Sequence, residues 1–203
     1  MRDRIIRWLE KNVSPYRLQH ILGVESTCIE LAQCHRLDKQ QAAQAGLMHD
    51  LAKFFPPQKL LKIAARANIS VDRVCAEHAH LLHAEVGAVV AQQEFGVNDP
   101  EILNAISNHT LGSPHMSKLS CLVFIADVIE PNRGNNEKLE AIRLVARENL
   151  YKCLQQTSDY SLEYLLSKQK IIHPRTVLTR NWAMAKVKET TLKSSMKTRI
   201  KSS

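Results

Sequence analysis

Apolar residues recur every three or four positions along most of this chain, which is the spacing of one face of an α-helix. The segment 15–34 shows the pattern clearly. Its apolar stripe contains Leu18, Ile21, Val24, Cys28 and Leu31. Ser14 and Pro15 precede the stripe as a capping side chain and a first-turn proline, the usual beginning of a helix. We therefore predict a helix over residues 15–34.

Capping residues, prolines and glycines divide the remaining sequence into further helical segments. The predicted helices cover residues 2–11, 39–54, a short stretch around 60–63, 81–95, 100–108, 118–130, 136–156 and 159–169. The run CLVFI at 121–125 is also compatible with a buried strand, but its flanks and length favour a helix. We find no period-two alternation and no internal repeat. The pattern predicts an all-α fold, a single helical bundle.

Composition divides the chain into a body and a tail. The formal net charge is +8, and the segment from residue 186 onward holds six basic residues and one acid, which contribute +5 of it. Ser, Thr and Lys dominate this segment, and its hydrophobic periodicity is weak. We expect one domain over residues 1–184 and a flexible, solubilising basic tail over 185–203. Weak contact of this tail with nucleic acid is the alternative.

The remaining composition bears on location and redox state. The chain has no apolar run long enough to span a membrane or to serve as a signal peptide. Its five cysteines are scattered, without a CxxC pair, which argues against a disulfide framework and against a structural zinc site. We expect a cytoplasmic protein with reduced thiols and no contact with membranes.

Ionisable side chains inside apolar helices are the main chemical signal. The doublet His49-Asp50 lies within AGLMHDLAKFF, residues 45–55, where burying unpaired ionisable groups is costly. Inward-facing positions on four other predicted helices are occupied by His20, His83, His109 and Asp127. One metal centre would satisfy all six groups. Imidazole with carboxylate suits iron, manganese, zinc or cobalt, and six ligands suit two ions, an arrangement used for phosphoryl chemistry.

Four motifs carry a resemblance to a known family. The segments GLMHDLAK, LLHAEVGAVVA, AISNHTLGSPHMSKL and FIADVIEPNR occur in this order. With His20, they resemble the HD-domain superfamily of metal-dependent phosphohydrolases. More narrowly, they resemble the symmetrical bis(5'-nucleosyl)-tetraphosphatases of the YqeK type. The similarity covers roughly residues 15–180. It departs at Leu51, where many relatives have an aromatic residue.

The resemblance implies an activity and a set of ligands. Such enzymes cleave diadenosine tetraphosphate symmetrically into two ADP at a di-iron-type centre. Carried over to this chain, His20, His49, Asp50 and Asp127 would hold one metal ion. His83 and His109 would hold the second, with Asp50 bridging the two. The resemblance also favours a homodimer.

Residues beside the ligands are candidates for substrate contacts. We expect Lys53 and Arg133, together with Asp50, to act directly in the reaction. Both cations would bind phosphate, Arg133 through its planar guanidinium. Glu130 is a candidate to orient a ligand histidine or Arg133. Thr110 and His115 are further candidates for contacts with phosphate or nucleobase. His78 and His80 are expected near the mouth of the pocket at most, and His173 in a loop without function.

Two alternatives remain open at this stage. Metal ligands do not choose the nucleotide, so a mononucleotide, a cyclic nucleotide or a guanosine tetraphosphate alarmone are alternative substrates. The basic tail suggests a second alternative, a non-catalytic module associated with nucleotides or RNA.

Overall fold

The structure, a computed structural model, describes the backbone of residues 1–201 and the side chains of residues 1–190. All of its regular elements within that range are helical. They are α1 (Arg2–Asn12), α2 (Pro15–His35), α3 (Lys39–Met48), α4 (Pro57–Arg66), α5 (Arg73–Glu77), η1 (Ala79–Leu82), α6 (His83–Phe95), α7 (Pro100–Asn108), α8 (Lys118–Ile129), η2 (Pro131–Arg133), α9 (Glu137–Glu148), α10 (Leu150–Ser167) and α11 (Pro174–Lys201). The all-α prediction is confirmed.

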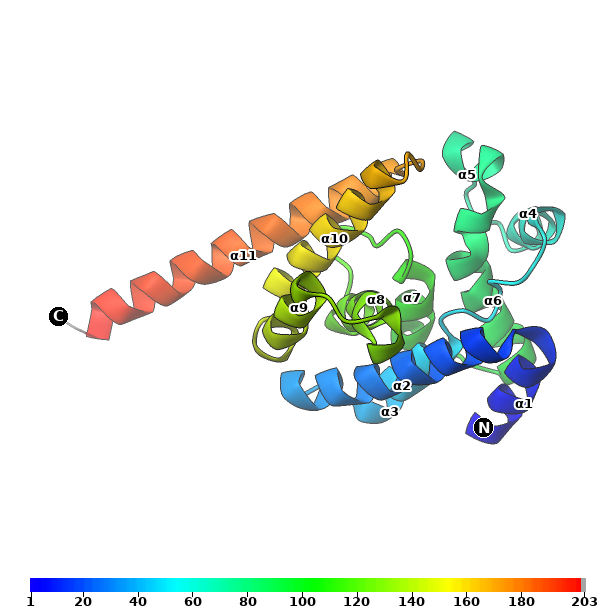
Figure 1. Cartoon of the computed structure of the whole chain (residues 1–203), viewed down its shortest axis with the longest axis horizontal. Helices are drawn as coiled ribbons and strands as arrows, with labels where there is room; N and C mark the ends of the chain where they lie inside the picture. Colours follow the sequence, from blue (N-terminus) through cyan, green and yellow to red (C-terminus); the bar gives the residue numbers. More distant parts are fainter. Residues whose placement is uncertain (202–203) are drawn as a thin grey trace.

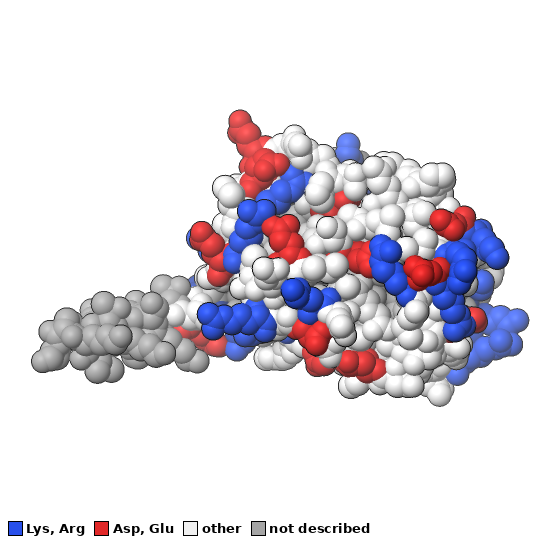
Figure 2. Space-filling model, turned by 90° about the horizontal axis from the view of Figure 1, so that it is seen from below, with Lys and Arg blue, Asp and Glu red and all other residues white. Residues whose placement is uncertain are grey.

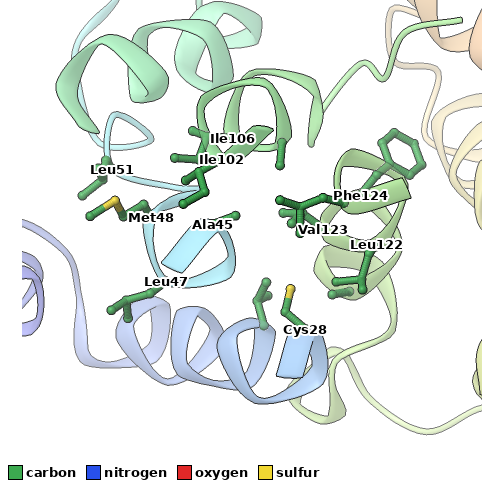
Figure 3. Packing of buried hydrophobic residues seen from close by; sticks show 14 of the residues in the cluster. Cys28, Ala45, Leu47, Met48, Leu51, Ile102, Ile106, Leu122, Val123 and Phe124 are labelled. Atoms are coloured by element: carbon green, nitrogen blue, oxygen red, sulfur yellow. The ribbon is translucent and has the colours of Figure 1, made fainter. Parts of the chain in front are cut away.

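The core lies around α3. Helix α3 packs along α2 on one side and contacts α7 and α8 on the other (Figure 1). Figure 3 shows Ala45 at the centre of this packing, among side chains from α2, α7 and α8. A Cβ atom on Gly46 would lie 2.9 Å from Cys28 Sγ. Small residues on α3 therefore permit the close approach of α2.

Helix starts follow the predicted capping residues. Ser14, Asp38, Asp99 and Ser117 each accept a hydrogen bond from a backbone N–H in the first turn of the helix that follows. These contacts satisfy donors that have no partner inside the helix. Local chemistry thus fixes where four of the bundle's helices begin.

The predicted helix 39–54 is too long. Helix α3 ends at Met48, and residues 49–54 form consecutive tight turns. Their backbone bonds, such as Lys53 N–H to Asp50 O at 3.1 Å, span three residues instead of four. Pro56 and Pro57 follow, and neither has an N–H to continue the helical ladder. His49 and Asp50 consequently lie just past a helix end.

The predicted break near residues 157–158 is also wrong. Helix α10 is continuous through Thr157 and Ser158, and the Ser158 hydroxyl donates to Leu154 O at 2.8 Å. The break lies at Asn149, whose side chain accepts from Lys152 N–H and caps α10. A hydroxyl that bonds back to its own helix removes the apparent stop signal.

The C-terminal segment continues a helix. Helix α11 extends away from the bundle in Figure 1 and runs across the expected domain boundary without a break. The flexibility of residues 185–203 and their separation from the domain stay predictions, since side chains beyond residue 190 lie outside the described part. On the face in Figure 2, basic side chains gather at the end opposite this helix, with acidic ones among them. Within the described residues, no helix is long and apolar enough to cross a membrane.

Candidate metal centre

The six predicted ligands come together at one point of the bundle. Five of them, the four histidines and Asp50, are at most 3% exposed, and the Asp127 side chain is 19% exposed. They come from α2, from the turns after α3 and α7, from the start of α6, and from α8. They are His20, His49, Asp50, His83, His109 and Asp127.

Asp50 stands between two groups of ligands. Its Oδ2 lies 3.5 Å from His49 Nε2. Its Oδ1 lies 3.4 Å from His83 Nε2 and 3.6 Å from His109 Nε2. The ligand atoms of His20, His49 and Asp50 lie within 4.8 Å of one another, as do those of Asp50, His83 and His109. The carboxylate therefore faces one group with each oxygen.

Asp127 joins the first group. Its Oδ1 lies 3.1 Å from His20 Nε2 and 3.8 Å from His49 Nε2. Burial opposes the ionisation of this carboxyl, but His20 and the charge of Arg133 outweigh it and hold its pKa well below the usual range. Burial of Asp50 is likewise outweighed, by His49 and the other imidazoles beside it, and its pKa is also well below the usual range. Both carboxylates are ionised.

Each imidazole presents the same nitrogen to the centre. The Nδ1 atoms of His49, His83 and His109 lie 2.7–2.8 Å from the backbone carbonyls of Gly46, His80 and Ile106, three residues earlier in each case. His20 Nδ1 lies 2.9 Å from Glu130 Oε1. Because these carbonyl and carboxylate oxygens accept, Nδ1 donates in every ring. The Nε2 atoms all point inward, as in ligands of a metal ion.

Helix ends explain this common orientation. His49 follows α3, His83 follows η1 and His109 follows α7, so each ring reaches one of the last carbonyls of its own helix. The C-terminal ends of α3 and α7 carry partial negative charge and favour cations, whereas His83 also begins α6. Local structure therefore sets both the proton positions and an electrostatic preference for positive charge.

The imidazole Nε2 atoms of the centre would be stabilised by a bound cation. His49 Nε2 is buried without a hydrogen-bond partner among the described residues. His83 Nε2 and His109 Nε2, both bearing lone pairs, lie only 3.2 Å apart. Burial lowers the pKa of His49 and that of His83 to about 4, so these rings stay neutral near pH 7. Neutral imidazoles with ionised carboxylates fit a divalent metal site.

Three cations surround the centre. Lys53 Nζ lies 3.2 Å from His83 Nε2, so the turns after α3 still direct it to the site. Arg133 donates from Nη2 to Asp127 Oδ1 at 2.6 Å. Arg17 donates from Nη1 to Asp50 Oδ2 at 3.0 Å. Sequence reasoning missed Arg17 as a site residue, although its position three residues before His20 puts both on one helix face.

Two residues support His20 from the side away from the centre, Glu130 and Gly23, and the sequence predicted only the first. Glu130 is fully buried, and its Oε2 accepts from Asn132 N–H at 2.8 Å while Oε1 faces His20. Glu130 thus orients a ligand histidine, one of the two roles expected for it. Gly23 was not anticipated. A Cβ atom there would collide with Glu130 Oε2, so only glycine leaves room for this carboxylate.

A cavity of about 870 Å³ opens beside the centre. Asp127, Arg133 and Thr110 line the end that adjoins the ligands, and Thr110 Oγ1 lies 3.0 Å from both His83 Nε2 and His109 Nε2. The far walls come from the η1 region, α8, α10 and the loop before α11. They include His78, His80, Phe124, Tyr160, Tyr164 and Lys170.

His115 is not brought to this cavity. Its residue is exposed, and its ring lies 5.9 Å from that of Trp182 on α11. Its expected contact with substrate stays a prediction without support from the geometry. His78 and His80, in contrast, do line the cavity.

An all-helical fold with this set of imidazoles and carboxylates defines a class of protein. The model of the HD domain matches residues 17–132. That range includes all six candidate ligands and ends just past the buried Glu130. The fold and the site are those of an HD-domain protein.

Full-length relatives narrow the class. The chain is 34% identical over 184 residues to a Bacillus subtilis protein named symmetrical bis(5'-nucleosyl)-tetraphosphatase, covering 91% of this chain and 98% of that one. A Staphylococcus aureus protein of the same name is 30% identical, with 89% and 93% covered. The crystal structure of a predicted HD superfamily hydrolase involved in NAD metabolism from Clostridium acetobutylicum superposes with a TM-score of 0.85 at 33% identity, over 91% of this chain and 97% of the other. This chain therefore belongs to the HD-domain family and, within it, to the symmetrical bis(5'-nucleosyl)-tetraphosphatases.

Proposed function

We propose that this protein hydrolyses diadenosine tetraphosphate symmetrically into two ADP at a centre of two metal ions. The observation that carries the proposal is the pair of ligand groups sharing Asp50, next to a cavity large enough for a nucleoside. The names of the full-length relatives support this substrate. Iron is the first ion to test, with manganese, cobalt and zinc as alternatives that the same ligand types accept.

The ligands divide between two ions. His20, His49, Asp50 and Asp127 would hold one, and His83 and His109 would hold the other together with Asp50. Bound ions of this kind supply Lewis acidity to phosphate oxygens and lower the pKa of water towards neutrality. Glu130 keeps His20 in its ligating orientation, and the carbonyls behind the other three rings keep theirs.

Lys53 and Arg133 bind the phosphate chain. Both already lie at the centre, Lys53 beside His83 and Arg133 on Asp127. Their charges add to those of the metal ions against the four phosphates of the substrate, and the Arg133 guanidinium offers donors in the geometry that phosphate accepts. The leaving group is ADP, whose terminal phosphate is a weak base once its charge is screened. A strong general acid is therefore not required.

The cavity receives one nucleoside of the substrate. Aromatic walls from Tyr160, Tyr164 and Phe124 offer apolar contact to a base. Lys170 lies over the Tyr164 ring, 5.1 Å from its centroid, at the far end of the cavity. Thr110 stands between this space and the metal ligands, where a hydroxyl can bind phosphate or ribose. The two halves of a symmetrical substrate thus meet the protein differently.

Anaerobic purification, metal analysis and product identification test this function together. We expect two metal ions per chain and ADP as the sole product from diadenosine tetraphosphate. A substrate panel should include a mononucleotide, a cyclic nucleotide and guanosine tetraphosphate. Formation of ATP and AMP, or faster turnover of any panel member, would contradict the proposal.

Three further expectations are kept as predictions. The family resemblance favours a homodimer, which sedimentation of the purified protein tests. Location in the cytoplasm and weak nucleic-acid contact through the basic tail complete the set. If the unaltered protein binds RNA and does not hydrolyse any nucleotide tested, the non-catalytic alternative is favoured.

A further inference from the structure

Arg17 occupies an unusual place beside the candidate metal centre. It lies on α2, and its side chain is 30% exposed, whereas the Asp50 side chain that it contacts is 3% exposed. The hydrogen bond from Nη1 ends on Oδ2, the Asp50 oxygen that faces His49. A cation reaching in from the surface therefore covers an atom that would ligate a metal ion.

Arg17 differs from Arg133 in how firmly it is held. Arg133 donates from Nε to the Asp127 carbonyl at 2.8 Å and from Nη2 to the Asp127 carboxylate, so its own chain segment fixes it. Within the described residues, the Arg17 guanidinium makes one such bond, which leaves most of its five donors available. Arg133 lines the cavity, and Arg17 is not among the lining residues.

Charge balance indicates what these donors are for. The two carboxylates among the candidate ligands, Asp50 and Asp127, are each paired with one guanidinium. Metal ions bound to the same carboxylates leave both guanidinium charges in excess. An excess cation next to a metal site stabilises bound anions, and guanidinium matches phosphate oxygens particularly well. Because Arg17 does not line the cavity, it can contact only the part of a substrate that lies outside the cavity.

We propose that Arg17 binds the phosphates of the substrate half that lies outside the cavity. The tetraphosphate chain then crosses the centre from Arg133 on the cavity side to Arg17 on the other. The contact with Asp50 is the resting position of this side chain. The identity of the anion as a dinucleoside polyphosphate rests on the proposed function, but the anion-binding role does not.

Binding of inorganic tripolyphosphate to the manganese-loaded protein tests the proposal without any turnover. We expect Arg17→Gln to leave the number of bound Mn²⁺ ions unchanged and to weaken tripolyphosphate binding about tenfold or more in calorimetric titrations. Arg17→Lys should fall between, because it keeps the charge and loses the planar fork. In steady-state kinetics with diadenosine tetraphosphate, Arg17→Gln should raise KM.

A matched control is available on the neighbouring helix pair. Arg2 forms the same kind of pair with Glu25, at 2.7 and 2.8 Å, away from the centre. Arg2→Gln should leave both manganese and tripolyphosphate binding unchanged. If Arg17→Gln instead abolishes manganese binding, Arg17 only positions Asp50 and the proposal is wrong. Unchanged tripolyphosphate affinity would also overturn it. Failure of the proposed function would appear separately, in the products made by the unaltered protein.

Discussion

Two clusters of histidine and carboxylate within the described residues look alike by composition and differ in chemistry. The first is the candidate metal centre around Asp50. The second consists of Asp72, Cys75 and His173, whose ligand-type atoms also lie within 4.8 Å of one another. Proximity of suitable residue types is therefore not enough to define a metal site.

Proton positions separate the two clusters. At the centre every Nδ1 donates, and every Nε2 points inward to the other ligands. In the second cluster His173 Nδ1 accepts from Arg175 N–H at 3.0 Å, so Nε2 carries the proton and donates to Asp72 Oδ2 at 2.6 Å. Burial raises the pKa of the Cys75 thiol to about 11. The polar atoms of His173 in this cluster thus have hydrogen-bond partners. These bonds connect the N-terminus of α5 to the loop before α11.

Helix polarity differs in the same sense. Three ligand histidines, His49, His83 and His109, follow the C-terminal ends of α3, η1 and α7, although His83 also begins α6. Asp72 caps the N-terminus of α5, and His173 directly precedes α11. C-terminal ends favour cations and N-terminal ends favour anions. The backbone thus reinforces the difference that the imidazole protons establish.

The largest expected effect comes from removing the shared carboxylate. Asp50→Ala should abolish metal content and hydrolysis, because both ligand groups lose a member. Asp72→Ala is the matched change in the second cluster and should leave metal content and kcat near those of the unaltered protein. Elemental analysis and ADP release measure both. Metal loss in Asp72→Ala would show that the second cluster also binds an ion.

A smaller effect is expected from Gly23→Ala. The added methyl group displaces Glu130, and His20 loses the acceptor that orients it. Metal affinity should fall about 10–100-fold, the usual cost of losing such a partner. Gly96→Ala is the control, since Gly96 has a φ of 71° and no atom within 4 Å of a Cβ. It should cost about 1–2 kcal/mol of stability with unchanged metal affinity.

Acid should destabilise the metal-free protein through two histidines of the centre. The pKa values of His49 and His83 are lowered to about 4 in the folded state, against about 6.5 in the unfolded chain. Between these values the unfolded state binds more protons, so stability falls as the pH drops from 6.5 to 4. Thermal unfolding should show this slope, and His49→Gln should make it shallower. An unchanged slope in His49→Gln would assign the effect to other groups.

The smallest effect is expected from the C-terminal segment. Deletion of residues 185–203 should leave metal content and hydrolysis nearly intact, because the ligands and the cavity lining all precede it. Any affinity for RNA at low salt should fall with the removal of its basic residues. Loss of hydrolysis in this variant would mean that the segment supports the site.

The sequence predicted the helix starts that have a strong capping residue, and it missed the end of α3 and the start of α10. Capping side chains such as Ser14 and Ser117 have a direct local effect, and each begins a helix as expected. The end of α3 was missed because Leu51 and Ala52 are buried whether the chain continues as a helix or turns. Apolar periodicity cannot distinguish those two cases.

The candidate ligands could be predicted because burying an ionisable side chain without a partner costs free energy. An ionisable group such as Asp50 or His49 in an apolar helix needs a partner, and this need is visible in the sequence. Arg17 and Gly23 gave no such signal, since an arginine on a helix surface and a small residue in a helix are ordinary. Their importance depends on Asp50 and Glu130, which meet them only in the folded chain.

The orientation of His20 has a consequence for assembly of the protein. Three ligand rings are aligned by carbonyls of their own turns, so they are preset as soon as each turn forms. His20 alone takes its alignment from a carboxylate 110 residues away, at the end of α8. The ligand set is complete only when α8 has docked on α2. A partly folded chain therefore lacks the complete ligand set. We expect only fully folded molecules to bind the metal ions and to become active.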